Sequence, residues 1–202
     1  YQHISKIIFD DIEQLNNLKL NGYISCQELR SGLPNFLPNY VMGRKLWDIS
    51  LSFETLQKEY MEAAYGIRAQ DVINYLVQLS DLCNCDYFNG KGERIHSETA
   101  LQMEKAAHLT RSFTSTHFDN TEDDSKSPVF QKLLAYHCRT YPLLEDALYL
   151  LAKGDKKNAF QKWNEFREEI CKGEDEFQPY LDVYRITEVS QKYTGFSFPE
   201  NV

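Results

Sequence analysis

The chain has 202 residues, of which 42% are hydrophobic and 26% charged, and its formal net charge is -8. This composition is typical of a globular protein with a core of its own. The negative charge argues against a nucleic-acid partner, which would need clustered Lys and Arg. No apolar run in the sequence reaches the roughly 18–20 residues of a membrane span, so we expect no membrane partner.

The first residue and the cysteines give two further expectations. Tyr1 lies inside a helical pattern, and we therefore expect the chain to be a piece of a longer protein whose leader is not visible. The five cysteines are odd in number and scattered, unlike a disulfide framework, which favours a reducing, cytoplasmic compartment. The 13 Tyr and 12 Phe leave open whether the rings form a core or a sugar-stacking surface.

The first 38 residues read as a helix, a strand and a loop. Apolar residues at helical spacing predict a helix over residues 1–20. Residues 22–26 are the one convincing strand, and residues 27–39, with Gly32, Pro34 and Pro38, form a loop. A lone strand cannot make a sheet, so this piece needs partner strands that the chain does not supply.

From Pro38 onward every element is predicted to be helical. A short apolar helix covers residues 40–47, and a second covers 53–65, with Ser52 as its N-cap and Gly66 as its C-terminal cap. A third helix is expected over residues 71–87, with Cys83 on its apolar stripe.

The second half of the chain is expected to hold four helices. Ser97 is the expected cap of a helix over residues 97–118, which an acidic loop over residues 119–126 follows. Ser127-Pro128 signals the start of the next helix, which Pro142 should kink or split. Asp155 caps a helix that Gly173 ends, and a last helix covers residues 179–193. Six helices with short connections predict an antiparallel bundle.

Residues 39–66 carry a resemblance to a known family. An apolar and aromatic run, a basic residue and then Leu46-Trp47-Asp48 precede a helix that closes on Tyr65-Gly66. This junction resembles that of glycoside hydrolase family 67, the alpha-glucuronidases, and of related uncharacterised glycoside-hydrolase-like proteins. The resemblance is firmest over residues 22–79. Residues 148–163 and 178–182 are similar to the helical tails of such relatives.

The resemblance implies a division of the chain and a parent enzyme. Residues 1–38 would be the last helix-strand-loop piece of a (β/α)8 barrel, and residues 39–202 a C-terminal helical domain. The fold class is then mainly α, a bundle of about six helices preceded by a short α/β remnant of the barrel. The implied partners are the N-terminal catalytic barrel of the parent and the carbohydrate substrate of that barrel. No cofactor is implied.

The candidate site residues follow the predicted strand. Barrel enzymes place substrate-facing side chains directly after their strands, which makes Gln27, Glu28 and Arg30 candidates for lining a substrate site. The alternative is that all three are loop residues with local hydrogen bonds. Glycosidic cleavage needs two carboxylates, and no partner for Glu28 can be named, so the catalytic residues stay unknown. Trp47 and Tyr65 are interpreted as packing anchors between barrel and bundle.

Two other patterns are interpreted as structural. Cys83-x-Cys85 lacks the second ligand pair of a structural zinc site, so no metal is expected. His137 and Cys138 point about 100° apart on a helix, so a buried, hydrogen-bonded core histidine is expected instead of a Cys/His dyad.

We therefore expect a C-terminal helical domain that supports the barrel of a glycoside hydrolase and is not catalytic alone. The alternative is a non-enzymatic helical module that binds a partner protein. Formation of a homodimer through the helical domain is left open.

Overall fold

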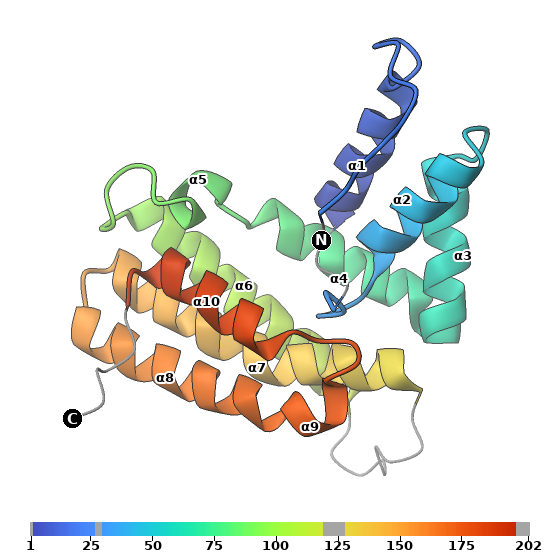
Figure 1. Cartoon of the computed structure of the whole chain (residues 1–202). Helices are drawn as coiled ribbons and strands as arrows, with labels where there is room; N and C mark the ends of the chain where they lie inside the picture. Colours follow the sequence, from blue (N-terminus) through green and yellow to red (C-terminus); the bar gives the residue numbers. More distant parts are fainter. Residues whose placement is uncertain (1, 27–29, 119–127, 197–202) are drawn as a thin grey trace. The chain divides into compact units, whose positions relative to one another are not determined.

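The structure is a computed structural model that describes residues 2–26, 30–118 and 128–196, and these residues are mainly helical (Figure 1). The chain divides into two compact units. Unit 1 holds residues 1–81 and 124–134, and unit 2 holds residues 82–123 and 135–202. The domain boundary expected at residue 38 falls inside unit 1, in the first turn of a helix, and as a boundary with a parent barrel it stays a prediction.

Unit 1 is built from α1 (Gln2–Gln14), α2 (Leu37–Trp47), α3 (Phe53–Tyr65), the 3-10 turn η1 (Gly66–Arg68), α4 (Ala69–Asp81) and the first turns of α7 (Val129–Ala152). Helix α2 packs on α1 and α3, and α4 also contacts α1 and α3 (Figure 1). The helices bury apolar side chains between them, including Phe9, Ile12, Val41, Leu56, Met61, Val72 and Leu76. These residues recur at helical spacing, which is why the sequence pattern located the helices.

Helix α1 ends earlier than the predicted helix over residues 1–20. Lys19 has a positive φ of 57°, its N–H donates to Asn16, and the N–H of Leu20 donates to Leu15. These two bonds form a Schellman motif, which stops the helix and turns the chain outward.

The strand expected at residues 22–26 is wrong. These residues have no regular secondary structure and are exposed. Backbone N–H and C=O groups hold a strand only where a neighbouring strand pairs with them, and the elements of the described residues include no strand. The β-prone sequence of this segment is therefore left extended along the surface of unit 1.

The caps predicted for α3 are confirmed, but the helix expected over residues 71–87 is broken. The Ser52 hydroxyl accepts the N–H of Thr55, and the N–H of Gly66 donates to Glu62. Helix α4 ends at Asp81, and a separate short helix, α5 (Cys85–Phe88), follows. The Asn84 side chain accepts the N–H of Tyr87 and so starts α5 afresh.

Unit 2 contains α5, α6 (Ser97–His117), the remainder of α7, α8 (Lys156–Lys172), α9 (Glu174–Phe177) and α10 (Val183–Thr194). Helices α6 and α7 are antiparallel, because the N–H of His96 donates to Ala152 while Arg111 pairs with Asp146. Helix α10 packs against α8, and the Tyr136 hydroxyl of α7 donates to the Ile170 carbonyl of α8 (Figure 1). Trp163 is fully buried, and its Nε1–H donates to Ser190 Oγ of α10 at 3.1 Å.

Several helix limits in unit 2 differ from the predicted ones. The cap of α6 is His96 and not Ser97, because the His96 Nδ1 atom accepts the N–H of Thr99. Pro142 is buried inside one continuous α7, so the predicted split does not occur. Helix α10 begins at Val183 behind an Asp182 cap, four residues later than expected.

The remaining predicted features are either confirmed or outside the described residues. Asp155 caps α8, and Gly173 ends it. The acidic loop over residues 119–126 and the start signal at Ser127 lie outside the described residues, as does most of the C-terminal tail.

Candidate functional site

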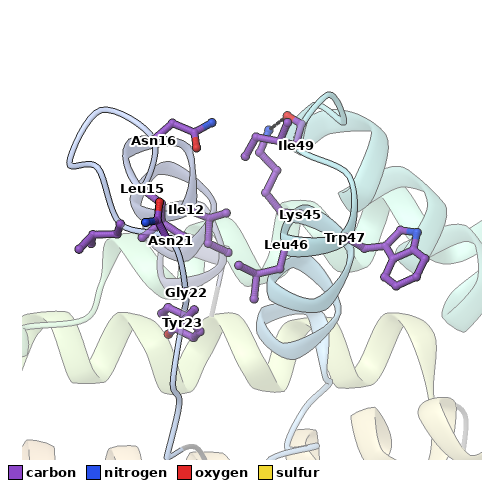
Figure 2. Close-up of a pocket in the computed structure, with 11 residues that line it drawn as sticks. Ile12, Leu15, Asn16, Asn21, Gly22, Tyr23, Lys45, Leu46, Trp47 and Ile49 are labelled. Carbon is purple, nitrogen blue, oxygen red and sulfur yellow. Dashed lines mark hydrogen bonds between the residues drawn. The ribbon is translucent and has the colours of Figure 1, made fainter.

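A pocket of about 330 Å³ opens on unit 1 between the end of α1, the segment after it and the end of α2 (Figure 2). This volume is near the lower end of the range for small-molecule sites. Most of its lining residues have apolar side chains, and its polar side-chain groups are two amides, the Tyr23 hydroxyl and one ammonium group. The lining residues are Ile12, Leu15, Asn16, Leu20, Asn21, Gly22, Tyr23, Lys45, Leu46, Trp47 and Ile49.

Lys45 is the charged residue of the pocket wall, and its charge is already satisfied. Its side chain is 1% exposed, and Nζ donates to Glu13 Oε1 at 3.0 Å and to the carbonyls of Ile49 and Leu51 at 2.7 and 2.8 Å. The ammonium also lies 4.0 Å from the centre of the Phe9 ring. An ammonium has three donors, so these bonds hold the turn after α2 and leave no donor for a ligand.

Exposed apolar side chains lie on the end of α2, on the turn after it and on the segment after α1. We call these residues together the Trp47 face: Leu20, Tyr23, Ile24, Leu46, Trp47 and Ile49. All of them except Ile24 also line the pocket. Trp47 is 91% exposed and Ile24 95% exposed. In Figure 2 the Trp47 indole projects away from α1 and from the rest of the pocket, so it does not form the floor of a sugar site there.

The predicted site residues are not brought together at this pocket. Gln27 and Glu28 lie outside the described residues, while Arg30 is partly buried and is not among the pocket-lining residues. Tyr65 is buried in unit 1 and its hydroxyl donates to the Pro34 carbonyl at 3.5 Å. Trp47 has no comparable burial within the described chain. An anchoring role of Trp47 and Tyr65 against a barrel stays a prediction.

The polar groups of the pocket come from four side chains. The amides of Asn16 and Asn21 can donate and accept hydrogen bonds, and so can the Tyr23 hydroxyl. The Lys45 ammonium is engaged with Glu13, Ile49 and Leu51. The arrangement can therefore orient a polar group beside an apolar surface.

A histidine and a glutamate are buried in unit 2. His137 is fully buried and stacks on the Tyr141 ring with centroids 4.8 Å apart, and burial lowers the pKa of His137 to about 3. This confirms that His137 is a buried core residue, while the hydrogen bonding expected of its ring stays a prediction. Glu145 is 1% exposed, and burial raises its pKa well above the ordinary value of 4.5. Nothing in the sequence indicates that Glu145 is buried, apart from its position among apolar residues of α7.

Metal and membrane features were also sought among residues 2–26, 30–118 and 128–196. Within these ranges no group of three or more His, Cys, Asp and Glu side chains is arranged to hold a metal ion. No helix in the described part of the chain combines the length and apolar character needed to cross a bilayer.

Comparison with protein-family models, with curated proteins and with solved structures found no match to this chain.

Sequence reasoning missed the role of Lys45, although a signal was present. Leu37, Val41 and Lys45 are spaced four residues apart, and all three are buried on one face of α2. A lysine that continues an apolar stripe is expected to bury at least its aliphatic stem, and the structure shows that Lys45 buries its ammonium as well. Trp47 lies two residues after Lys45, outside this stripe, and its side chain is exposed to solvent.

Proposed function

We propose that this chain is the C-terminal helical domain of a glycoside hydrolase, and that it supports the catalytic barrel by docking through the Trp47 face. The observation that carries the proposal is the exposure of that face on a helical unit with a well-filled core. The junction at Leu46-Trp47-Asp48 supports a barrel as the partner. The domain contributes no catalytic group of its own in this proposal.

The exposure of Trp47 supports docking on energetic grounds. A buried Trp removes about 150–250 Å² from water. At about 25 cal/mol per Å², that area corresponds to about 4–6 kcal/mol. Interfaces concentrate their binding energy in such residues. Leu46 and Ile49, which are 42% and 49% exposed, extend the apolar surface around the indole.

The segment at residues 20–26 supports a β-containing partner. It is exposed, β-prone and without regular structure in this chain. Segments of this kind pair readily with the edge of a sheet in another domain, which supplies the missing backbone hydrogen bonds. A barrel that lacked one strand would offer such an edge, so the extended segment and the Trp47 face would engage together.

Photo-crosslinking in the full-length natural protein tests the proposal. A benzophenone amino acid at position 47 should crosslink to N-terminal barrel peptides of the same polypeptide. The same probe at Tyr184, which is 77% exposed in unit 2, should not. Crosslinks from position 47 to a different polypeptide would favour the alternative of a separate protein-interaction module. Equal, unspecific labelling from both positions would refute docking through this face.

The sequence that precedes Tyr1 in the natural gene gives an independent test. Several βα repeats are expected there, and their absence would refute the barrel partner. If the repeats are found, a panel of glycosidase substrates should detect turnover by the parent protein. A Glu28→Gln variant then tests the substrate-lining role of that residue, and unchanged kcat and KM would remove it.

Location and assembly are further parts of the proposal. No disulfide joins Cys26, Cys83, Cys85, Cys138 and Cys171, which suits a reducing compartment, and we place the parent in the cytoplasm. Sedimentation of the full chain tests the homodimer that was left open above, and a Trp47→Ser variant shows whether the Trp47 face forms it.

A further inference from the structure

Two cysteine thiols lie close together in the turn between α4 and α5. The Sγ atoms of Cys83 and Cys85 are 3.9 Å apart, and both residues are exposed. A disulfide has an S–S length of about 2.05 Å. The two sulfurs therefore need to approach by about 2 Å, which is within the reach of side-chain rotation.

The backbone at Asn84 brings these thiols together. Asn84 has φ -94° and ψ 88°, close to the inverse γ-turn, which folds the chain back between its two neighbours. Its side-chain oxygen accepts the N–H of Tyr87 at 3.0 Å, and its Nδ2 atom donates to Thr99 Oγ1 at 2.9 Å. The turn is thus held by bonds that involve neither sulfur.

The surroundings of the pair disfavour the thiolate form. Partial desolvation, then the charge and hydrogen bond of the Cys85 thiol, raise the pKa of Cys83. Tyr193 of α10 faces the same pair: desolvation first, and then both thiols, raise its pKa. The Tyr193 ring also packs on Phe88 with centroids 5.3 Å apart. A dithiol whose reduced form gains no thiolate stabilisation holds its disulfide more firmly than one that does.

We propose that Cys83 and Cys85 form a redox-active dithiol, which a small disulfide of the glutathione class converts to an intramolecular disulfide. One cysteine thiolate attacks a sulfur of the oxidised glutathione, its S–S bond breaks, and one glutathione thiolate leaves. The second cysteine thiolate then attacks the resulting mixed disulfide, and the second glutathione leaves. Two electrons pass from the protein to glutathione, and the two thiol protons end on the two departing glutathione thiolates.

The closed ring would constrain the chain where α4 ends and α5 begins. Asn84 lies inside the ring, and α5 packs against α10. Oxidation would therefore stiffen the turn that places Phe88 against Tyr193. The inference concerns thiol chemistry of this turn and stands apart from the docking role of the Trp47 face.

Equilibration of the full chain with reduced and oxidised glutathione tests the proposal. After an acid quench and alkylation, trypsin releases residues 69–91, a peptide with Cys83 and Cys85 as its two cysteines. The expected product is this peptide with a Cys83–Cys85 disulfide. Its mass is two hydrogens below that of the dithiol peptide, and neither cysteine is alkylated. Cys83→Ser and Cys85→Ser variants should each carry one glutathione on the remaining thiol, while Cys171→Ser should behave as wild type. The proposal would be overturned if the wild-type peptide carried two glutathiones or two alkyl groups at every ratio of reduced to oxidised glutathione.

A second comparison separates the folded geometry from mere sequence proximity. Short flexible links give effective concentrations of order millimolar, and the native turn should exceed that value by about tenfold. The ratio of intramolecular to mixed disulfide should therefore fall about tenfold in urea, and fall partly in an Asn84→Ala variant. Circular dichroism confirms that the variant is folded. An equal ratio in folded and unfolded chains would refute the role of the turn.

Discussion

Glu145 on α7 provides the sharpest test of the core of unit 2. Its Oε1 atom is buried without a hydrogen-bond partner, and Oε2 accepts a long bond of 3.4 Å from Thr110 Oγ1 of α6. Burial raises the pKa of Glu145. The Thr110 bond and Arg111 lower it, Asp146 raises it, and burial is the largest influence. We therefore expect a protonated Glu145 in the folded protein at pH values where the unfolded chain has already lost that proton.

The sign of the pH dependence follows from this difference. Above the unfolded pKa of about 4.5, the folded state binds the extra proton. The free energy of unfolding then falls by about 1.4 kcal/mol per pH unit until the folded pKa is reached. His137 acts in the opposite direction, because its pKa of about 3 lies below its ordinary 6.5. Its contribution falls as the pH drops below 6.5.

Above pH 4.5 the contributions of the two residues to the free energy of unfolding change in opposite directions in the wild type. A Glu145→Gln variant removes the contribution of the carboxyl and leaves that of His137. Its free energy of unfolding should rise by about 3 kcal/mol between pH 4.5 and 6.5 and then level off. In the wild type the rise should be smaller, because the contribution of Glu145 falls with pH. Urea unfolding followed by circular dichroism, from pH 4.5 to 8, measures both curves.

A Thr110→Val variant serves as the matched second change. It removes the hydrogen bond that favours ionised Glu145, so the decline should extend to higher pH than in the wild type. Parallel pH curves for wild type and Glu145→Gln would refute the assignment of a buried, protonated carboxyl.

Two further predictions concern unit 1 and the close packing of unit 2. Lys45→Met should lower the free energy of unfolding by about 1–3 kcal/mol in urea titrations, because the carbonyls of Ile49 and Leu51 lose their donor. A Lys45→Met variant as stable as the wild type would contradict a stabilising role of the bonds from the Lys45 ammonium to these carbonyls. Gly173→Ala should destabilise by about 1–3 kcal/mol, since the new methyl group overlaps the Tyr136 hydroxyl, which donates to Ile170. The matched control is Gly43→Ala in α2, where the new methyl group meets open space and should stabilise the protein by about 1 kcal/mol. Changes in Tm of the same sign for Gly173→Ala and Gly43→Ala would argue against the close packing at Gly173.

Local signals predicted the helices of this chain well. Apolar spacing and the Ser52 and Asp155 caps located α3 and α8, because these signals act within a few residues of the feature they set. The errors arose where a local preference lacked its tertiary partner or had a competitor. The strand at residues 22–26 has β-prone residues but no paired strand, and the Asn84 side chain interrupts an otherwise continuous apolar stripe.

The candidate site was harder to predict because it depends on which side chains face water. Trp47 and Tyr65 carry equal weight in the sequence pattern, yet Trp47 is 91% exposed and Tyr65 is 2% exposed. Trp47 is the last residue of α2 and Tyr65 the last residue of α3, and the packing of these two helices within unit 1 separates them. Glu145 is similar, since a glutamate in a helix gives no sign of its burial until its neighbouring helices are placed.

The two tryptophans of the chain differ in burial. Trp163 is 0% exposed, and its indole N–H has Ser190 as a partner, so it needs nothing beyond unit 2. Trp47 sits at the last residue of α2, where Lys45 and its bonds to Glu13, Ile49 and Leu51 fix the local backbone. An exposed indole on a backbone held this firmly loses little conformational entropy when a partner covers it. Lys45→Met should therefore weaken the proposed docking through the Trp47 face, even though the Lys45 ammonium is itself buried.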